Sequence, residues 1–187
     1  MIPLNAPNLV TFSRIILIPL LIGIFYMPID GGTQNALASG LFIFAGITDW
    51  LDGYLARRLN QMSAFGAFLD PVADKLIVVA ALLALLYLNR VDMIVALIIV
   101  GREIAISALR EWMAKVGQAA SVAVAFIGKL KTVAQMVAIP LLLFHDALFG
   151  LDCQWLGTIL INVAAVLTAI SMLYYLRKAL PYAAVRS

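Results

Sequence analysis

Long apolar stretches, separated by short polar connections, limit most strongly how this chain can fold. A helix needs about 20 apolar residues to cross a bilayer, and six stretches of roughly that length follow one another. Their expected bounds are 8–26, 35–58, 66–88, 92–115, 127–144 and 155–176. The 187 residues are 64% hydrophobic and 12% charged, whereas a soluble domain is about half apolar and a quarter charged. We therefore predict an all-α integral membrane protein, a bundle of six transmembrane helices forming one domain over residues 1–187.

The basic residues gather on one side of this predicted bundle. If the amino terminus is cytoplasmic, the inside connections are 59–65, 116–126 and the segment after 176. In or beside them lie Arg57, Arg58, Lys115, Lys129, Lys131, Arg177, Lys178 and Arg186, whereas the outside connections hold Arg90. An excess of Lys and Arg marks cytoplasmic connections, so we predict that both termini are cytoplasmic. Because the basic residues sit at helix ends, lipid phosphate explains them better than a nucleic-acid partner does. A single cysteine, Cys153, excludes an intramolecular disulfide.

A compact acidic stretch joins the second and third apolar segments. Residues 49–74 read DWLDGYLARRLNQMSAFGAFLDPVAD and hold four of the ten acidic residues. Asp49 and Asp52 are three apart and Asp70 and Asp74 are four apart, so each pair shares a helix face. Four carboxylates at the edge of an apolar medium repel one another and lose hydration, so they need a cation. Oxygen ligands of this kind suit Mg²⁺ or Mn²⁺. The alternative is a set of helix-terminal charges solvated at the interface.

The same stretch resembles the signature of the CDP-alcohol phosphotransferases, D-x2-D-G-x2-A-R-x8-G-x3-D-x3-D. Every fixed position is present, namely Asp49, Asp52, Gly53, Ala56, Arg57, Gly66, Asp70 and Asp74. The resemblance continues through Asn8, Thr11 and Arg14. REIAISALREWMA from Arg102 and IGKLKTVAQM from Ile127 are similar to bacterial members that use glycerol 3-phosphate. The resemblance implies transfer of the phosphatidyl group of CDP-diacylglycerol to glycerol 3-phosphate, with release of CMP. It also implies a homodimer in the bacterial inner membrane, surrounded by membrane lipids. The distribution of basic residues predicts that the active site faces the cytoplasm.

The resemblance also implies roles for the motif residues. Two Mg²⁺ or Mn²⁺ ions would be held by Asp49, Asp52, Asp70 and Asp74, and Asp74 would also accept the proton of the acceptor hydroxyl. The CDP-lipid would be bound by Asn8, Arg14, Asp52, Gly53, Ala56, Arg57 and Gly66. Small residues leave room for a flat ligand beside a helix, and an arginine can pair with phosphate through two parallel hydrogen bonds. Close helix packing is the alternative for the small residues, and anchoring of the first helix is the alternative for Asn8 and Arg14.

The acceptor needs cations of its own because glycerol 3-phosphate is a dianion. We assign this role to Arg102, Arg110, Lys129 and Lys131, since charged side chains inside membrane spans usually face a cavity. Arg110 could instead pair with Glu103, seven residues earlier, and the two lysines could be signals of topology only. Lys75 is expected to extend toward the lipid headgroups, and a part in the site is the alternative.

Other functions remain open at the level of sequence. The motif binds the CDP group that the whole family shares, so serine, inositol phosphate or phosphatidylglycerol could replace glycerol 3-phosphate. A membrane prenyltransferase would typically show two aspartate motifs far apart on more spans. A small transporter could use intramembrane charges as an ion path, but it would have little use for the Gly-x-x-Ala-Arg insert. Release of CMP from a CDP-lipid separates the family from the last two.

Overall fold

The structure, a computed structural model, describes residues 6–59, 64–117 and 126–183. Over these ranges the regular secondary structure is helical apart from one short hairpin. The described helices are α1 (Ala6–Ile24), α2 (Gly31–Leu59), α3 (Ala64–Tyr87), α4 (Met93–Lys115), α5 (Phe126–Phe144) and α6 (Cys153–Ala183). The ends of these helices lie within four residues of the predicted ends, with one exception. The exception is the end of α6, which continues past 176 through Arg177 and Lys178.

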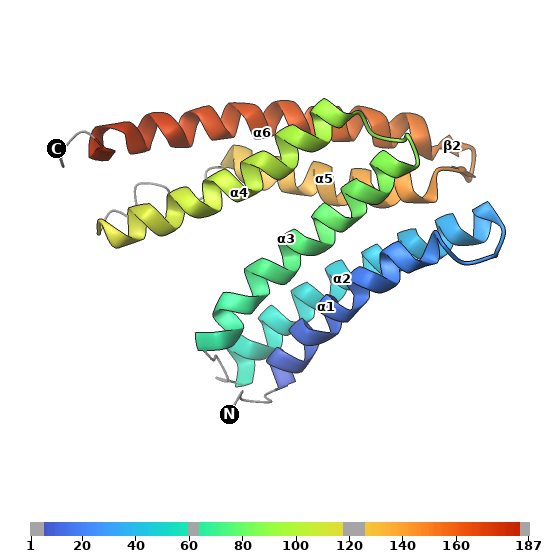
Figure 1. The fold of residues 1–187 in the computed structure, drawn as a ribbon, viewed down its shortest axis with the longest axis horizontal. Helices are drawn as coiled ribbons and strands as arrows, with labels where there is room; N and C mark the ends of the chain where they lie inside the picture. Colours follow the sequence, from blue (N-terminus) through green and yellow to red (C-terminus); the bar gives the residue numbers. More distant parts are fainter. Residues whose placement is uncertain (1–5, 60–63, 118–125, 184–187) are drawn as a thin grey trace.

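The helices form two layers (Figure 1). One layer holds α1, α2 and α3, in which α1 packs against both of the others. The second holds α4, α5 and α6, in which α6 packs against both α5 and α4. The layers meet through α2 with α5 and through α3 with α4 and α5. They lie closest near β2 and diverge toward the start of α1 and the end of α6 (Figure 1).

The core runs through both layers. Its buried side chains come from every described helix and include Leu21, Phe42, Leu82, Ile99, Leu142 and Ile161. A second, smaller cluster joins α4 to the last turns of α6 through Ile106, Met113, Tyr175 and Ala179. Many large apolar side chains point outward instead, among them Ile16, Phe44 and Ile170. An apolar outer surface is what a bundle surrounded by lipid requires.

One described helix is long and apolar enough to cross a membrane by length and composition. It is α6, over Cys153–Tyr182, while Thr11–Ile24 and Leu130–Phe144 are shorter apolar stretches. Charged side chains such as Asp70, Asp74 and Glu103 interrupt the apolar length of α3 and α4. The prediction of an all-α bundle is confirmed for the described residues, and the six membrane crossings stay a prediction.

A two-stranded hairpin precedes α6 and was not expected from the sequence. Strand β1 (Ala147–Leu148) pairs antiparallel with β2 (Leu151–Asp152). The turn residues Phe149 and Gly150 have φ values of 51° and 82°. Positive φ at both turn residues matches the twist of paired strands. The usual signal for such a turn is Asn-Gly or Asp-Gly, and a phenylalanine at the first position conceals it.

Arg90 makes hydrogen bonds to two helices at the end of the molecule where the layers lie closest. Its guanidinium donates to the carbonyl oxygens of Leu142 and Leu143 at 3.2 and 2.8 Å, and to Asn35 Oδ1 at 2.8 Å. Burial lowers the pKa of Arg90, and the nearby carboxylate of Asp146 opposes that change. A cation at the carboxyl end of α5 is favoured by the helix dipole. Arg90 thus links the α3–α4 connection to the start of α2 and to the end of α5.

Candidate active site

Three motif carboxylates meet on one buried guanidinium. Arg14 on α1 is 1% exposed, and its Nη1 lies 2.5 Å from Asp49 Oδ1 on α2. The same Nη1 pairs with Asp74 Oδ1 on α3, and Nη2 lies 3.8 Å from Asp70 Oδ1. Thr11, one helical turn before Arg14, donates its hydroxyl to Asp70. Three helices that are separate in sequence are therefore joined at one charged centre.

The carboxylates around Arg14 have the chemistry that a divalent cation requires. Their side chains are 42–46% exposed, so they remain open to an ion from solution, and they converge from two helices. Hard oxygen donors of this type are what Mg²⁺ and Mn²⁺ prefer. No three His, Cys, Asp or Glu side chains in the described part of the chain form a ready-made metal cage. Arg14 lies at the point where the three aspartates converge.

A cavity of about 380 Å³ extends from this centre into the space between the layers. Its walls come from five helices. They comprise Arg14, Phe42, Ala45, Gly46, Asp49, Pro71, Asp74, Lys75, Ile77, Val78, Glu103, Lys131, Thr132, Gln135 and Met136. Apolar atoms make up most of the surface of this lining, and charged and polar side chains are placed among them, as in many sites that bind a small molecule. The cavity thus connects the aspartates of the motif to polar residues of α4 and α5.

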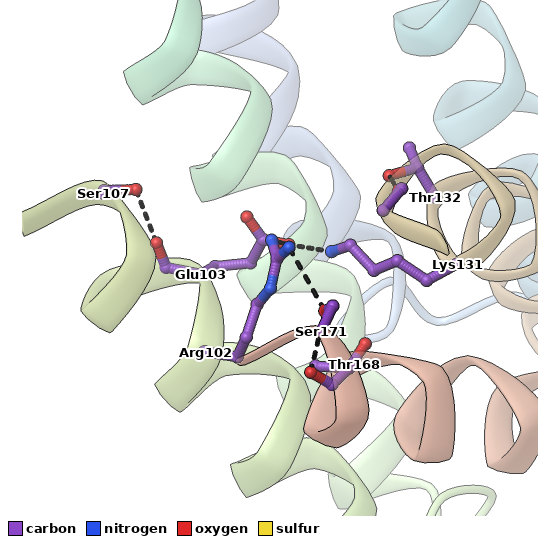
Figure 2. Close-up of polar contacts among 8 residues, drawn as sticks. Arg102, Glu103, Ser107, Lys131, Thr132, Thr168 and Ser171 are labelled. Carbon is purple, nitrogen blue, oxygen red and sulfur yellow. Dashed lines mark hydrogen bonds and ion pairs between the residues drawn. The ribbon is translucent and has the colours of Figure 1, made fainter. Parts of the chain in front are cut away.

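A second charged cluster joins α4 to α5 (Figure 2), and its members Glu103 and Lys131 line the cavity. Glu103 on α4 pairs with Lys131 Nζ on α5, and Arg102 Nη1 lies 3.4 Å from the same carboxylate oxygen. Arg102 and Lys131 are both buried. Arg102 Nη2 also lies 3.4 Å from Ser171 Oγ on α6, and its guanidinium lies 5.9 Å from the Tyr175 ring centre. Glu103 is therefore the shared counter-ion of two buried cations.

Three of the four predicted acceptor cations have described side chains, and their surroundings differ. Lys131 lines the cavity, whereas Arg102 faces away toward Ser171 and Tyr175. Arg110 is exposed and its guanidinium lies 5.7 Å from the Tyr175 ring centre. Glu103, its alternative partner, pairs with Lys131 and Arg102 instead. Lys131 is the member of the predicted set that reaches the cavity in the described structure.

The structure describes the side chains of only some of the residues that were predicted to bind the CDP-lipid. Arg14 lines the cavity, and Gly66 is buried near the start of α3. The side chains of Asn8, Asp52, Gly53, Ala56, Arg57 and Lys129 lie outside the described residues. Their assignments stay predictions.

The structure adds residues that the sequence did not single out as site residues. Lys75 lines the cavity, although it was expected to extend toward the headgroups. Gln135 lines the cavity too, and its buried Oε1 has no hydrogen-bond partner among the described residues. The signal that could have revealed Gln135 is its spacing, since it follows Lys131 by four residues and shares its helix face.

The chain is similar to known proteins over most of its length. The family model described as CDP-alcohol phosphatidyltransferase matches residues 4–173. Proteins named CDP-diacylglycerol–glycerol-3-phosphate 3-phosphatidyltransferase from Escherichia coli (strain K12) and Shigella flexneri serotype 5b (strain 8401) are each 48% identical over 178 residues. The protein of that name from Salmonella choleraesuis (strain SC-B67) is 48% identical over 177 residues. Each alignment covers 94% of this chain and 94% of the relative. The chain belongs to the CDP-alcohol phosphatidyltransferase family.

Proposed function

We propose that this chain transfers the phosphatidyl group of CDP-diacylglycerol to glycerol 3-phosphate, producing phosphatidylglycerol phosphate and CMP. The observation that carries the proposal is the cavity that has the motif aspartates at one side and buried Lys131 at the other. One side suits the metal-bound diphosphate of the donor, and the other offers a cation to the phosphate of the acceptor. The names of relatives 48% identical over 94% of the chain support the choice of acceptor.

In the proposed reaction, a hydroxyl oxygen of glycerol 3-phosphate attacks the β-phosphorus of the CDP-lipid. A new P–O bond forms as the bond between that phosphorus and the oxygen of CMP breaks, and CMP leaves with the bonding electrons. Asp74 accepts the hydroxyl proton. Arg14 contributes by holding Asp49 and Asp74 near each other. Positioning and neutralisation of charge account for most catalysis of phosphoryl transfer.

Asp49, Asp52, Asp70 and Asp74 would hold two Mg²⁺ or Mn²⁺ ions. When bound, such ions neutralise the attacking and leaving oxygens of a displacement at phosphorus. Asn8, Arg14, Asp52, Gly53, Ala56, Arg57 and Gly66 would border the CDP group. Lys131 would meet the acceptor phosphate in the cavity, with Lys129, Arg102 and Arg110 adding positive charge around it.

We place the six helices in the bacterial inner membrane, with the active site facing the cytoplasm and both termini on that side. The outward apolar side chains of the bundle would contact lipid, and the acyl chains of the donor would remain in the bilayer. Figure 1 supports this arrangement, because the start of α1 and the end of α6 lie at the same, open side of the two layers. A homodimer is proposed from the family resemblance.

The proposal is tested by measuring the release of CMP from CDP-diacylglycerol by purified protein in detergent with Mg²⁺. Glycerol 3-phosphate, serine, inositol 1-phosphate and phosphatidylglycerol would be supplied singly, and we expect release with glycerol 3-phosphate. Asp74→Asn is the matched variant: it should lose at least a hundredfold in kcat while still binding the CDP-lipid. Release with another acceptor would overturn the assigned acceptor, and no release with any of them from folded, metal-loaded protein would overturn the reaction.

A further inference from the structure

Gln135 is a buried amide whose carbonyl oxygen accepts no hydrogen bond from the described residues. The residue is 4% exposed, and its buried Oε1 has no hydrogen-bond partner among the described residues. An unpaired polar atom in a protein interior is unfavourable, because it has lost its hydrogen bonds to water without replacement. Turning the amide over would only exchange the unpaired acceptor for an unpaired donor. Buried polar groups are nearly always paired in native proteins, so a partner from outside the chain is the natural explanation.

The position of Gln135 indicates where that partner comes from. Gln135 lines the cavity that also contains Asp74 and Lys131. It follows Lys131 by four residues on α5, so the two side chains lie on one helix face, about one turn or 5.4 Å apart. The cavity walls contributed by Phe42, Ile77 and Val78 are apolar and have no donor to offer. The neighbouring donors of the lining on the same helix are engaged elsewhere, since Lys131 pairs with Glu103 and Thr132 donates to Gly128 O. A donor for Oε1 is therefore available from the molecule that occupies the cavity.

Glycerol 3-phosphate, the proposed acceptor of the phosphatidyl group, can supply such a hydrogen-bond donor. A carbonyl oxygen repels phosphate oxygens and accepts hydrogen bonds from O–H or N–H groups. Glycerol 3-phosphate has two hydroxyls, of which one reacts and one keeps its proton. With its phosphate at Lys131 and its reacting hydroxyl directed to Asp74, the remaining hydroxyl is the donor available to an amide one turn further along α5.

We propose that Gln135 selects the acceptor by accepting a hydrogen bond from its non-reacting hydroxyl, an inference that rests on the proposed function. Gln135 is thus a specificity-determining residue, which favours a phosphate ester carrying a second hydroxyl over one that lacks it. A site built to bind a hydroxyl discriminates strongly against the analogue without it, because the buried polar group of the protein is then left unpaired.

The test measures the release of CMP from CDP-diacylglycerol by the full chain in detergent. The acceptor is either glycerol 3-phosphate or 3-hydroxypropyl phosphate, which lacks the middle hydroxyl. For the wild-type protein we expect kcat/KM to favour glycerol 3-phosphate by about tenfold or more, the value of one hydrogen bond. Gln135→Met keeps the length of the side chain without its amide. It should lower kcat/KM for glycerol 3-phosphate about tenfold and leave the value for 3-hydroxypropyl phosphate within about twofold.

Two further variants keep the result interpretable. Asn162 is an exposed amide of α6 that donates to its own helix at Thr158 O, 2.7 Å away. Asn162→Leu removes an amide far from the cavity and should leave the preference between the two acceptors unchanged. If Gln135→Met does not fold, Gln135→Asn withdraws the amide by one methylene and should reduce the same preference.

Different results would overturn different claims. An equal loss of activity with both acceptors would show that Gln135 has a structural role. A raised KM for the CDP-lipid alone would show that Gln135 contacts the CDP-lipid instead of the acceptor. Either result would overturn the proposal. Wild-type protein that releases CMP only with an acceptor other than glycerol 3-phosphate would overturn the proposed function and this inference together. That outcome is visible before any variant is made, so the two failures are distinguishable.

Discussion

At the residue scale, the charged centre depends on Arg14. Its buried guanidinium contacts Asp49, Asp70 and Asp74 on two other helices. Removing one partner of a buried ion pair costs about 3–5 kcal/mol, and the cost is smaller here because the three carboxylates are nearly half exposed. Arg14 is thus a structural counter-ion as well as a predicted ligand of the donor.

We expect Arg14→Met in the presence of chelator to destabilise the fold by about 2 kcal/mol. The midpoint of thermal unfolding in detergent would then fall by about 4–8 °C. Millimolar Mg²⁺ should restore part of that loss, because a divalent cation can replace the guanidinium among the carboxylates. Lys115→Met is the control, since Lys115 pairs with Glu111 at 2.8 Å on the exposed surface and such pairs contribute little. A variant whose midpoint does not respond to Mg²⁺ would show that the aspartates hold no cation of this kind.

At the element scale, α5 and α6 pack closely at Gly157. A Cβ atom added there would lie 2.8 Å from Leu142 Cγ and 3.2 Å from the Leu142 backbone nitrogen. The backbone atom cannot move aside without shifting α5, the helix that carries Lys131 and Gln135. The absence of a side chain at 157 thus sets the distance between two elements.

Gly157→Ala should therefore destabilise the protein by about 1–3 kcal/mol, despite the better helix propensity of alanine. Gly40→Ala is the matched control, because nothing lies within 4 Å of the added Cβ on α2. There we expect a gain of up to about 1 kcal/mol. Thermal unfolding of both variants in one detergent provides the comparison, and equal midpoints would contradict the close packing at Gly157.

At the scale of the whole molecule, the proposed orientation can be measured with fusions. Alkaline phosphatase joined after Gly150, in the hairpin before α6, should be active because this end is predicted to face the periplasm. The same enzyme joined after Lys178 should be inactive, and green fluorescent protein at that point should be fluorescent. An active phosphatase after Lys178 would invert the topology and place the aspartates on the side away from the cytoplasm.

The sequence by itself determined the elements and the chemistry carried on each. Lengths of apolar sequence predicted the six helices because hydrophobicity is a local property of the chain. Spacings of three and four predicted that Asp49 shares a face with Asp52, and Asp70 with Asp74, because helical geometry is local too. The motif residues led to the family for the same reason. The two departures from the prediction are also local: Phe149 conceals the hairpin turn, and α6 continues past its apolar part.

Only the tertiary structure decided which faces meet. Nothing in the spacing along α1 indicates that Arg14 would lie among aspartates of α2 and α3, 35 to 60 residues away. Nor does it indicate that Glu103 would pair with Lys131 rather than Arg110. The unpaired oxygen of Gln135 became visible once five helices enclosed a cavity around it. The physical reason is that helix periodicity defines the faces of each element, whereas packing between distant elements brings particular faces, and their charges, together.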